Sequence, residues 1–195
     1  MSERFDTAVQ RLDALNADDP VRVSVNGKET PRLIAEAERV SAWILHLCPD
    51  ASEALRLAGR AQHLMRWKIA RADFPEGRIG YRTWRRAAMD FHALETRRVL
   101  ESVGYDEDTI TRVSEILQKH GLRKNAEVQV MEDALCLSFL EHDFEPFAAK
   151  HTDEKLVHIL KETWQKMSPR GHAAAIELLP QLPERLQQLI REATA

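Results

Sequence analysis

The sequence predicts an all-α fold, a compact helical bundle with one short β-hairpin near its N-terminus. Apolar residues recur at spacings of three and four along most of the chain, as they do on the buried face of an amphipathic helix. The alternation typical of a strand occurs only at Val21, Val23 and Val25, just before an Asn-Gly pair that favours a tight hairpin turn. No segment repeats at a fixed period, so we expect one domain over residues 1–195.

Three helices are predicted in the first part of the chain. The first covers residues 3–16, where apolar side chains share one face. A threonine-proline pair, which reads as a helix cap followed by a first-turn proline, predicts the second over 31–47. The third begins with a capping box at Asp50 and ends near Lys68.

A loop over 72–80, with one proline and two glycines, precedes the fourth helix. This long helix covers 81–103 and ends at Gly104, where a left-handed residue is expected. Asp106 caps a fifth helix, which extends to about residue 119.

The most apolar helix covers residues 126–147. Three shorter helices follow it and begin at Thr152, Ser168 and Leu182-Pro183. We expect these C-terminal helices, over 152–193, to pack on the rest of the bundle.

The composition is that of a soluble globular protein, with 44% hydrophobic and 30% charged residues. The formal net charge of −3 favours neither nucleic acid nor an anionic membrane as a partner. The N-terminal residues carry acids and no unbroken apolar segment, so we expect a cytoplasmic protein. Cys48 and Cys136 stand far apart and indicate neither a metal site nor a disulfide framework.

Polar residues interrupt three predicted helices on apolar faces, at His63, His92 and Asp133. A buried carboxylate must be paired, hydrogen-bonded, protonated or bound to a metal, because an isolated buried charge is costly. Single histidines on such faces are usually core residues with satisfied hydrogen bonds. Helices of a bundle can also direct inward polar groups to one shared site, and we hypothesise that these three side chains converge.

Positive charge is concentrated between Arg56 and Arg86, a stretch with nine Arg or Lys residues and only two acidic residues. Planar guanidinium groups beside aromatic rings suit phosphate recognition and the stacking of a base. The other interpretation is a solvated helix face whose aromatic residues pack into the core. The arginines that we predict to bind an anionic substrate are Arg66, Arg78, Arg82 and Arg85, with Tyr81 and Trp84 beside them.

The stretch "QKMSPR", residues 165–170, is similar to the lysine-methionine-serine signature of class I aminoacyl-tRNA synthetases. That signature works with an α/β nucleotide-binding domain, and this chain lacks the alternating strands of such a domain. We therefore interpret Ser168-Pro169 as a helix cap and exclude aminoacylation.

Residues 32–142 resemble the HD-type phosphohydrolases, helical proteins in which histidines and aspartates on successive helices hold metal ions. The similar stretches are "IAEAERVSAWILHL", "DASEALRLAGRAQHL", "FHALETRRVL" and "MEDALCLSFLE". The resemblance implies an HD-like helical core and a divalent metal ion held by His63, His92, Asp133 and His120.

Two positions depart from the HD-type pattern. Glu36 stands where the leading histidine is expected, and Leu64 stands where the histidine-aspartate doublet has its aspartate. Glutamate can bind a hard metal ion, whereas leucine cannot. Either the ligand set is altered, or the fold has lost the metal and kept a pocket.

A closer resemblance covers nearly the whole chain. "QHLMRW", "FPEGRIGYRTWR", "FLEH" and "TWQKMSPRGHAAA" are together similar to the family called domain of unknown function 4202, for which no reaction is implied.

Two functions are therefore predicted. The first is a metal-dependent phosphohydrolase acting on a nucleotide or another phosphoester, in which Glu36 is a fourth metal ligand or the general base. The predicted arginines would neutralise the phosphate. The alternative is a non-catalytic protein, an adaptor or a binder of an anionic ligand, on a degenerate HD-like fold. The sequence does not indicate an oligomeric state.

Overall fold

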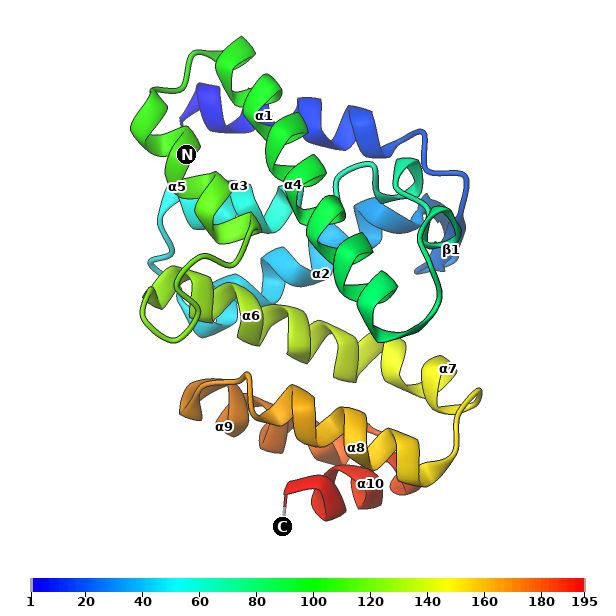
Figure 1. The fold of residues 1–195 in the computed structure, drawn as a ribbon. Coiled ribbons are helices and arrows are strands. Elements are labelled where there is room, and N and C mark those ends of the chain that lie inside the picture. The colour runs from blue at the N-terminus through cyan, green and yellow to red at the C-terminus, as the bar shows by residue number, and fades with distance from the viewer. Residues whose placement is uncertain (1, 195) are drawn as a thin grey trace.

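The computed structural model of this protein describes residues 2–194, and Figure 1 shows its helices in layers around a central helix. The elements in chain order are α1 (Glu3–Asn16), β1 (Arg22–Val25), β2 (Lys28–Pro31), α2 (Arg32–Leu47), α3 (Glu53–Ala61), the 3₁₀ turns η1 (Arg66–Lys68) and η2 (Arg71–Asp73), α4 (Gly77–Val103), α5 (Glu107–Leu117), α6 (Ala126–Ser138), the π-helical segment η3 (Phe139–Asp143), α7 (Phe144–Ala148), α8 (Asp153–Trp164), α9 (Pro169–Leu178), the 3₁₀ turn η4 (Leu179–Gln181) and α10 (Glu184–Thr194). The all-α prediction with one short hairpin is confirmed.

The hairpin forms where the alternating valines predicted it. β1 and β2 are antiparallel, with Val25 opposite Lys28. Asn26 and Gly27 between them have φ values of 51° and 78°, the left-handed pair that a two-residue hairpin turn needs.

The start of α2 differs from the prediction, because the threonine-proline pair belongs to β2 and supplies no side-chain cap. The carboxylate of the buried Asp19, which is distant in sequence, caps α2 instead. Its Oδ2 accepts a hydrogen bond from the backbone N–H of Leu33 at 3.0 Å, and its Oδ1 accepts one from Val21 at 3.0 Å. A carboxylate from the preceding loop thus binds the positive end of the helix dipole.

The third helix is shorter than predicted. Ser52, rather than Asp50, caps α3, and the helix ends at Ala61 instead of near Lys68. Beyond it the chain turns sharply, since His63 and Met65 both have left-handed backbones, with φ of 64° and 50°. Non-glycine residues are rarely found in this region, and such strain is often associated with functional sites.

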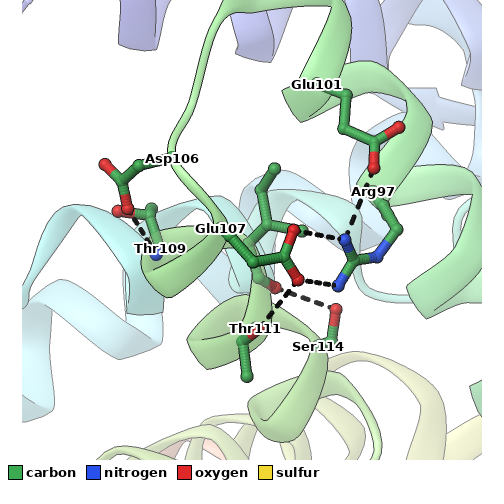
Figure 2. Close-up of polar contacts among 8 residues, drawn as sticks. Arg97, Glu101, Asp106, Glu107, Thr109, Thr111 and Ser114 are labelled. Carbon is green, nitrogen blue, oxygen red and sulfur yellow. Dashed lines mark hydrogen bonds and ion pairs between the residues drawn. The ribbon is translucent and has the colours of Figure 1, made fainter.

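α4 begins at Gly77, four residues before the predicted start. It ends at Gly104, whose φ of 85° confirms the predicted left-handed end. Figure 2 shows the polar contacts at the corner that follows: Arg97 binds both carboxylate oxygens of Glu107, at 2.7 and 2.8 Å. Asp106 accepts from the backbone N–H of Thr109 at 2.8 Å and so caps α5 as predicted.

α6 lies between two groups of helices (Figure 1). It packs against α2 on one side and against α9 on the other, while α8 and α10 pack on each other. The predicted apolar helix over 126–147 corresponds to α6, the π-helical segment and α7 in continuous succession. Within residues 2–194, no helix is both long and apolar enough to cross a bilayer.

Candidate functional site

A cavity of about 710 Å³ lies where α2, α4 and the C-terminal end of α6 meet. Its size is in the range of pockets that hold small ligands. The turn after α3 and the π-helical segment, which both depart from regular α-helix, complete its walls.

The cavity is strongly cationic although the chain as a whole is acidic. Two carboxylates, Glu36 and Asp143, line it. Six cationic side chains line it as well, which are Arg32, Arg66, Arg85, Lys119, Lys150 and Lys166. With histidines neutral, the lining therefore carries a formal charge of 6 − 2 = +4, against −3 for the whole protein.

Some of these cations are neutralised by neighbours. Arg32 lies 3.6 Å from Glu36, and Lys119 forms an ion pair with the buried Glu132. In contrast, the charged groups of Arg66, Arg85 and Lys166 form no ion pair or hydrogen bond with any residue that the structure describes.

Arg66 is held in place by an aromatic ring. Its guanidinium lies over Trp84, 4.8 Å from the ring centroid. Trp84 is itself fixed, because its indole N–H donates to the carbonyl of Ile69 at 2.9 Å. Burial lowers the pKa of Arg66, because the charged guanidinium is less well solvated there than in water.

His63 and Glu36 form a pair at the cavity wall. Nδ1 of His63 lies 3.3 Å from Oε2 of Glu36. Burial, followed by the charge of Arg66, holds the pKa of His63 well below its usual value, and burial raises the pKa of Glu36. A neutral His63 that donates from Nδ1 to Glu36 has its Nε2 lone pair free to act as an acceptor or base.

His92 has a fixed tautomer. Its Nδ1 lies 2.8 Å from the carbonyl oxygen of Leu64, and a carbonyl only accepts, so Nδ1 carries the proton. Burial lowers the pKa of His92 to about 3, which keeps the ring neutral. The ring centroids of His63 and His92 lie 6.0 Å apart, and both side chains line the cavity.

Asp133 does not reach this cavity. Its Oδ1 accepts from the backbone N–H of Ser168 at 2.8 Å, and its Oδ2 accepts from the Ser168 hydroxyl at 2.5 Å. Ser168 in turn accepts from the backbone N–H of Gly171 at 3.2 Å, which confirms the predicted cap of α9. The buried carboxylate is therefore satisfied by the start of a helix, and the hypothesis that it converges with the two histidines does not describe this structure.

The other predicted residues divide in the same way. Glu36, Arg66 and Arg85 line the cavity with the two histidines. The three other predicted site residues are exposed and lie outside the cavity: Arg78, Arg82 and His120.

The sequence profile of a family described as a domain of unknown function, DUF4202, matches residues 6–190. The chain belongs to the DUF4202 family. The match spans every element that lines the cavity of this DUF4202 protein, from Arg32 to Lys166. No curated protein and no solved structure matches the chain.

The HD-type resemblance stays a prediction for this DUF4202 chain. Among residues 2–194, no three His, Cys, Asp or Glu side chains are placed to share a metal ion. The candidate metal ligands that lie close together are the imidazoles of His63 and His92 and the carboxylate of Glu36, which is already bonded to His63. The ligand set implied by the resemblance is therefore not assembled. The function proposed below therefore does not depend on a metal.

Several lining residues of the DUF4202 cavity were missed by sequence reasoning. Arg32 could have been found, since it stands four residues before Glu36 on one helix. Lys119, Lys150 and Lys166 follow the ends of α5, α7 and α8, where no periodicity indicates which way a side chain points.

Proposed function

We propose that this DUF4202 protein binds a phosphorylated small molecule in the cationic cavity. The observation that supports this most is the set of three partly buried cations, Arg66, Arg85 and Lys166, whose charged groups form no ion pair within 4 Å among residues 2–194. Bringing like charges together in a partly desolvated place is costly unless an anion neutralises them. Guanidinium groups bind phosphate oxygens in a bidentate manner, so phosphate is the anion that fits best.

A small ligand fits better than a nucleic acid or a protein partner. The positive charge lies inside a concave cavity and not on an extended face, and the whole chain carries a net charge of −3. Aromatic side chains, including Tyr81 and Phe139, also line the cavity and offer a surface for a flat ring.

Titration calorimetry tests the proposal. Inorganic phosphate, ribose 5-phosphate and adenosine monophosphate are titrated into the wild type and into Arg66→Met and Arg85→Met. Each substitution removes one charge-assisted contact, so we expect about tenfold weaker binding. The matched controls are Arg78→Met and Arg82→Met, which lie on α4 with Arg85 but outside the cavity and should bind within about twofold of wild type. Equal losses in all four variants, or no binding to the wild type, would contradict the proposal.

Hydrolysis of the bound phosphoester is a second candidate, favoured by the His63 and Glu36 pair. Nε2 of His63 would take a proton from water while the water oxygen attacks phosphorus and the alcohol leaves with a proton from solvent. The negative charge of a bound phosphate would raise the pKa of His63 and make it a better base. We expect His63→Gln to bind the phosphoester but to release no phosphate from it. The same rate of phosphate release in the variant and the wild type would exclude His63 as the general base.

A further inference from the structure

Two buried side chains in the cavity wall have acceptor atoms without a hydrogen-bond partner. Gln62, 6% exposed, and His92, 3% exposed, both line the cavity. Oε1 of Gln62 and Nε2 of His92 are buried and receive no hydrogen bond from any residue in 2–194. Buried polar atoms in folded proteins are nearly always bonded, so each such exception needs an explanation.

A hydrogen-bond donor to either atom has to come from a water molecule or a ligand, because no residue in 2–194 supplies one. Because Nδ1 of His92 carries the proton that it donates to Leu64, its Nε2 has only a lone pair to offer. Oε1 of Gln62 is a carbonyl-type oxygen and can only accept. A fully ionised phosphate has no hydrogen to donate, so the group that the cations bind cannot satisfy these two atoms.

The charge of the cavity decides which kind of donor fits. Burial is the main cause of the lowered pKa values of His92 and His63, and the charge of Arg66 lowers both further, as Lys119 and Arg85 do for His63. An ammonium donor would be repelled by this positive field. A neutral hydroxyl group donates without adding charge.

We propose that the ligand is a hydroxyl-bearing phosphate of the sugar or polyol class, whose hydroxyl groups donate to Gln62 Oε1 and His92 Nε2. This inference rests on the proposed function, because the cations bind the phosphate of the same molecule. The two acceptors would then favour phosphate compounds that carry hydroxyl groups over phosphate compounds that lack them.

The test compares ribose 5-phosphate with tetrahydrofurfuryl phosphate, which has a similar ring and phosphate but no hydroxyl groups. We expect the wild type to bind ribose 5-phosphate at least tenfold more tightly by titration calorimetry, since a site with buried acceptors rejects an analogue that leaves them unbonded. Gln62→Leu should reduce this ratio to about threefold or less and leave the affinity for tetrahydrofurfuryl phosphate unchanged. Gln118→Leu, at a half-buried glutamine outside the cavity, is the matched control and should keep the full ratio.

His92→Phe provides a second variant, which replaces the other acceptor by a ring without one, and it should also lower the ratio. Equal affinity of the wild type for the two compounds would overturn the hydroxyl inference while the proposed phosphate binding stands. Binding of neither compound would show that the phosphate proposal itself is wrong. A dideoxy adenosine monophosphate that binds as tightly as adenosine monophosphate would also overturn the inference, because the donors would then be N–H groups of the base.

Discussion

At the scale of the residue, the turn after α3 explains why leucine stands at position 64. The Leu64 side chain is fully buried in the core, while its carbonyl oxygen accepts a hydrogen bond from Nδ1–H of His92. Next to it, the backbone N–H of Met65 donates to Oδ1 of Asn16 at 3.0 Å. The left-handed backbones of His63 and Met65 thus direct main-chain groups of this turn toward α4 and α1. Leu64 contributes to the site through its main chain, which side-chain chemistry does not reveal.

The neutral state of His92 predicts an acid-dependent loss of stability. Its pKa is about 3 when folded and about 6.5 when unfolded, so between these values the unfolded chain binds the extra proton. The stabilising effect is complete above pH 6.5 and is lost as the pH falls toward 3. From pH 7 to pH 5, urea unfolding of the wild type should therefore lose about 2 kcal/mol more than that of His92→Gln, which is neutral throughout. Parallel losses in the two proteins would show that His92 is not held neutral by the fold.

At the scale of the element, the contact between α6 and α9 is unusually close. Gly171 lies in the first turn of α9, and a methyl group placed there would come within 2.7 Å of Cγ of Asp133. This approach allows Asp133 to bind both the backbone N–H and the hydroxyl of Ser168. The glycine is therefore required by space.

Replacing Gly171 by alanine should destabilise the protein, although alanine has the higher helix propensity. The clash with Asp133 is expected to lower the free energy of unfolding by about 1–3 kcal/mol, measured by urea denaturation. Ala173→Gly, at an exposed position of the same helix, is the control and should cost at most about 1 kcal/mol. A Gly171→Ala protein as stable as the wild type would mean that α9 can move away from α6 at no cost.

At the scale of the whole molecule, the cavity collects positive charge from both ends of the chain. Arg32 comes from α2 near the N-terminus, and Lys166 comes from the turn between α8 and α9. The attachment of α9 to α6 through Asp133 and Ser168 holds this turn beside the cavity.

Lys166 should contribute to ligand affinity as much as Arg66 and Arg85 do. Titration of ribose 5-phosphate into Lys166→Met is expected to give about tenfold weaker binding, because an unpaired ammonium in the cavity is lost. Lys161→Met, at an exposed position of α8 outside the cavity, should bind like the wild type. If both variants bind equally well, the C-terminal helices take no part in the site.

The sequence predicted the fold class and most helix ends, because periodicity, glycines and caps are local signals. Gly104 and Ser168 lie where those signals placed them. Failures occurred where a distant group decides the local structure, as Asp19 does for α2. Of the predicted site, Glu36 and the two histidines meet, whereas Asp133 has the same burial signal but a different partner. Burial of a polar side chain can be predicted from one helix, but the identity of its partner depends on how helices are assembled.

The distance along the chain between Arg32 and Lys166 has a consequence for how the protein is made. Ribosomes add about 5–20 residues per second, so on the order of ten seconds separate the appearance of the first and last cations of the cavity. During that interval the nascent helices can pack their apolar faces, but the basic wall is incomplete. The complete cationic site would therefore form only after Lys166 has been synthesised, and the ligand could not guide the early steps of folding.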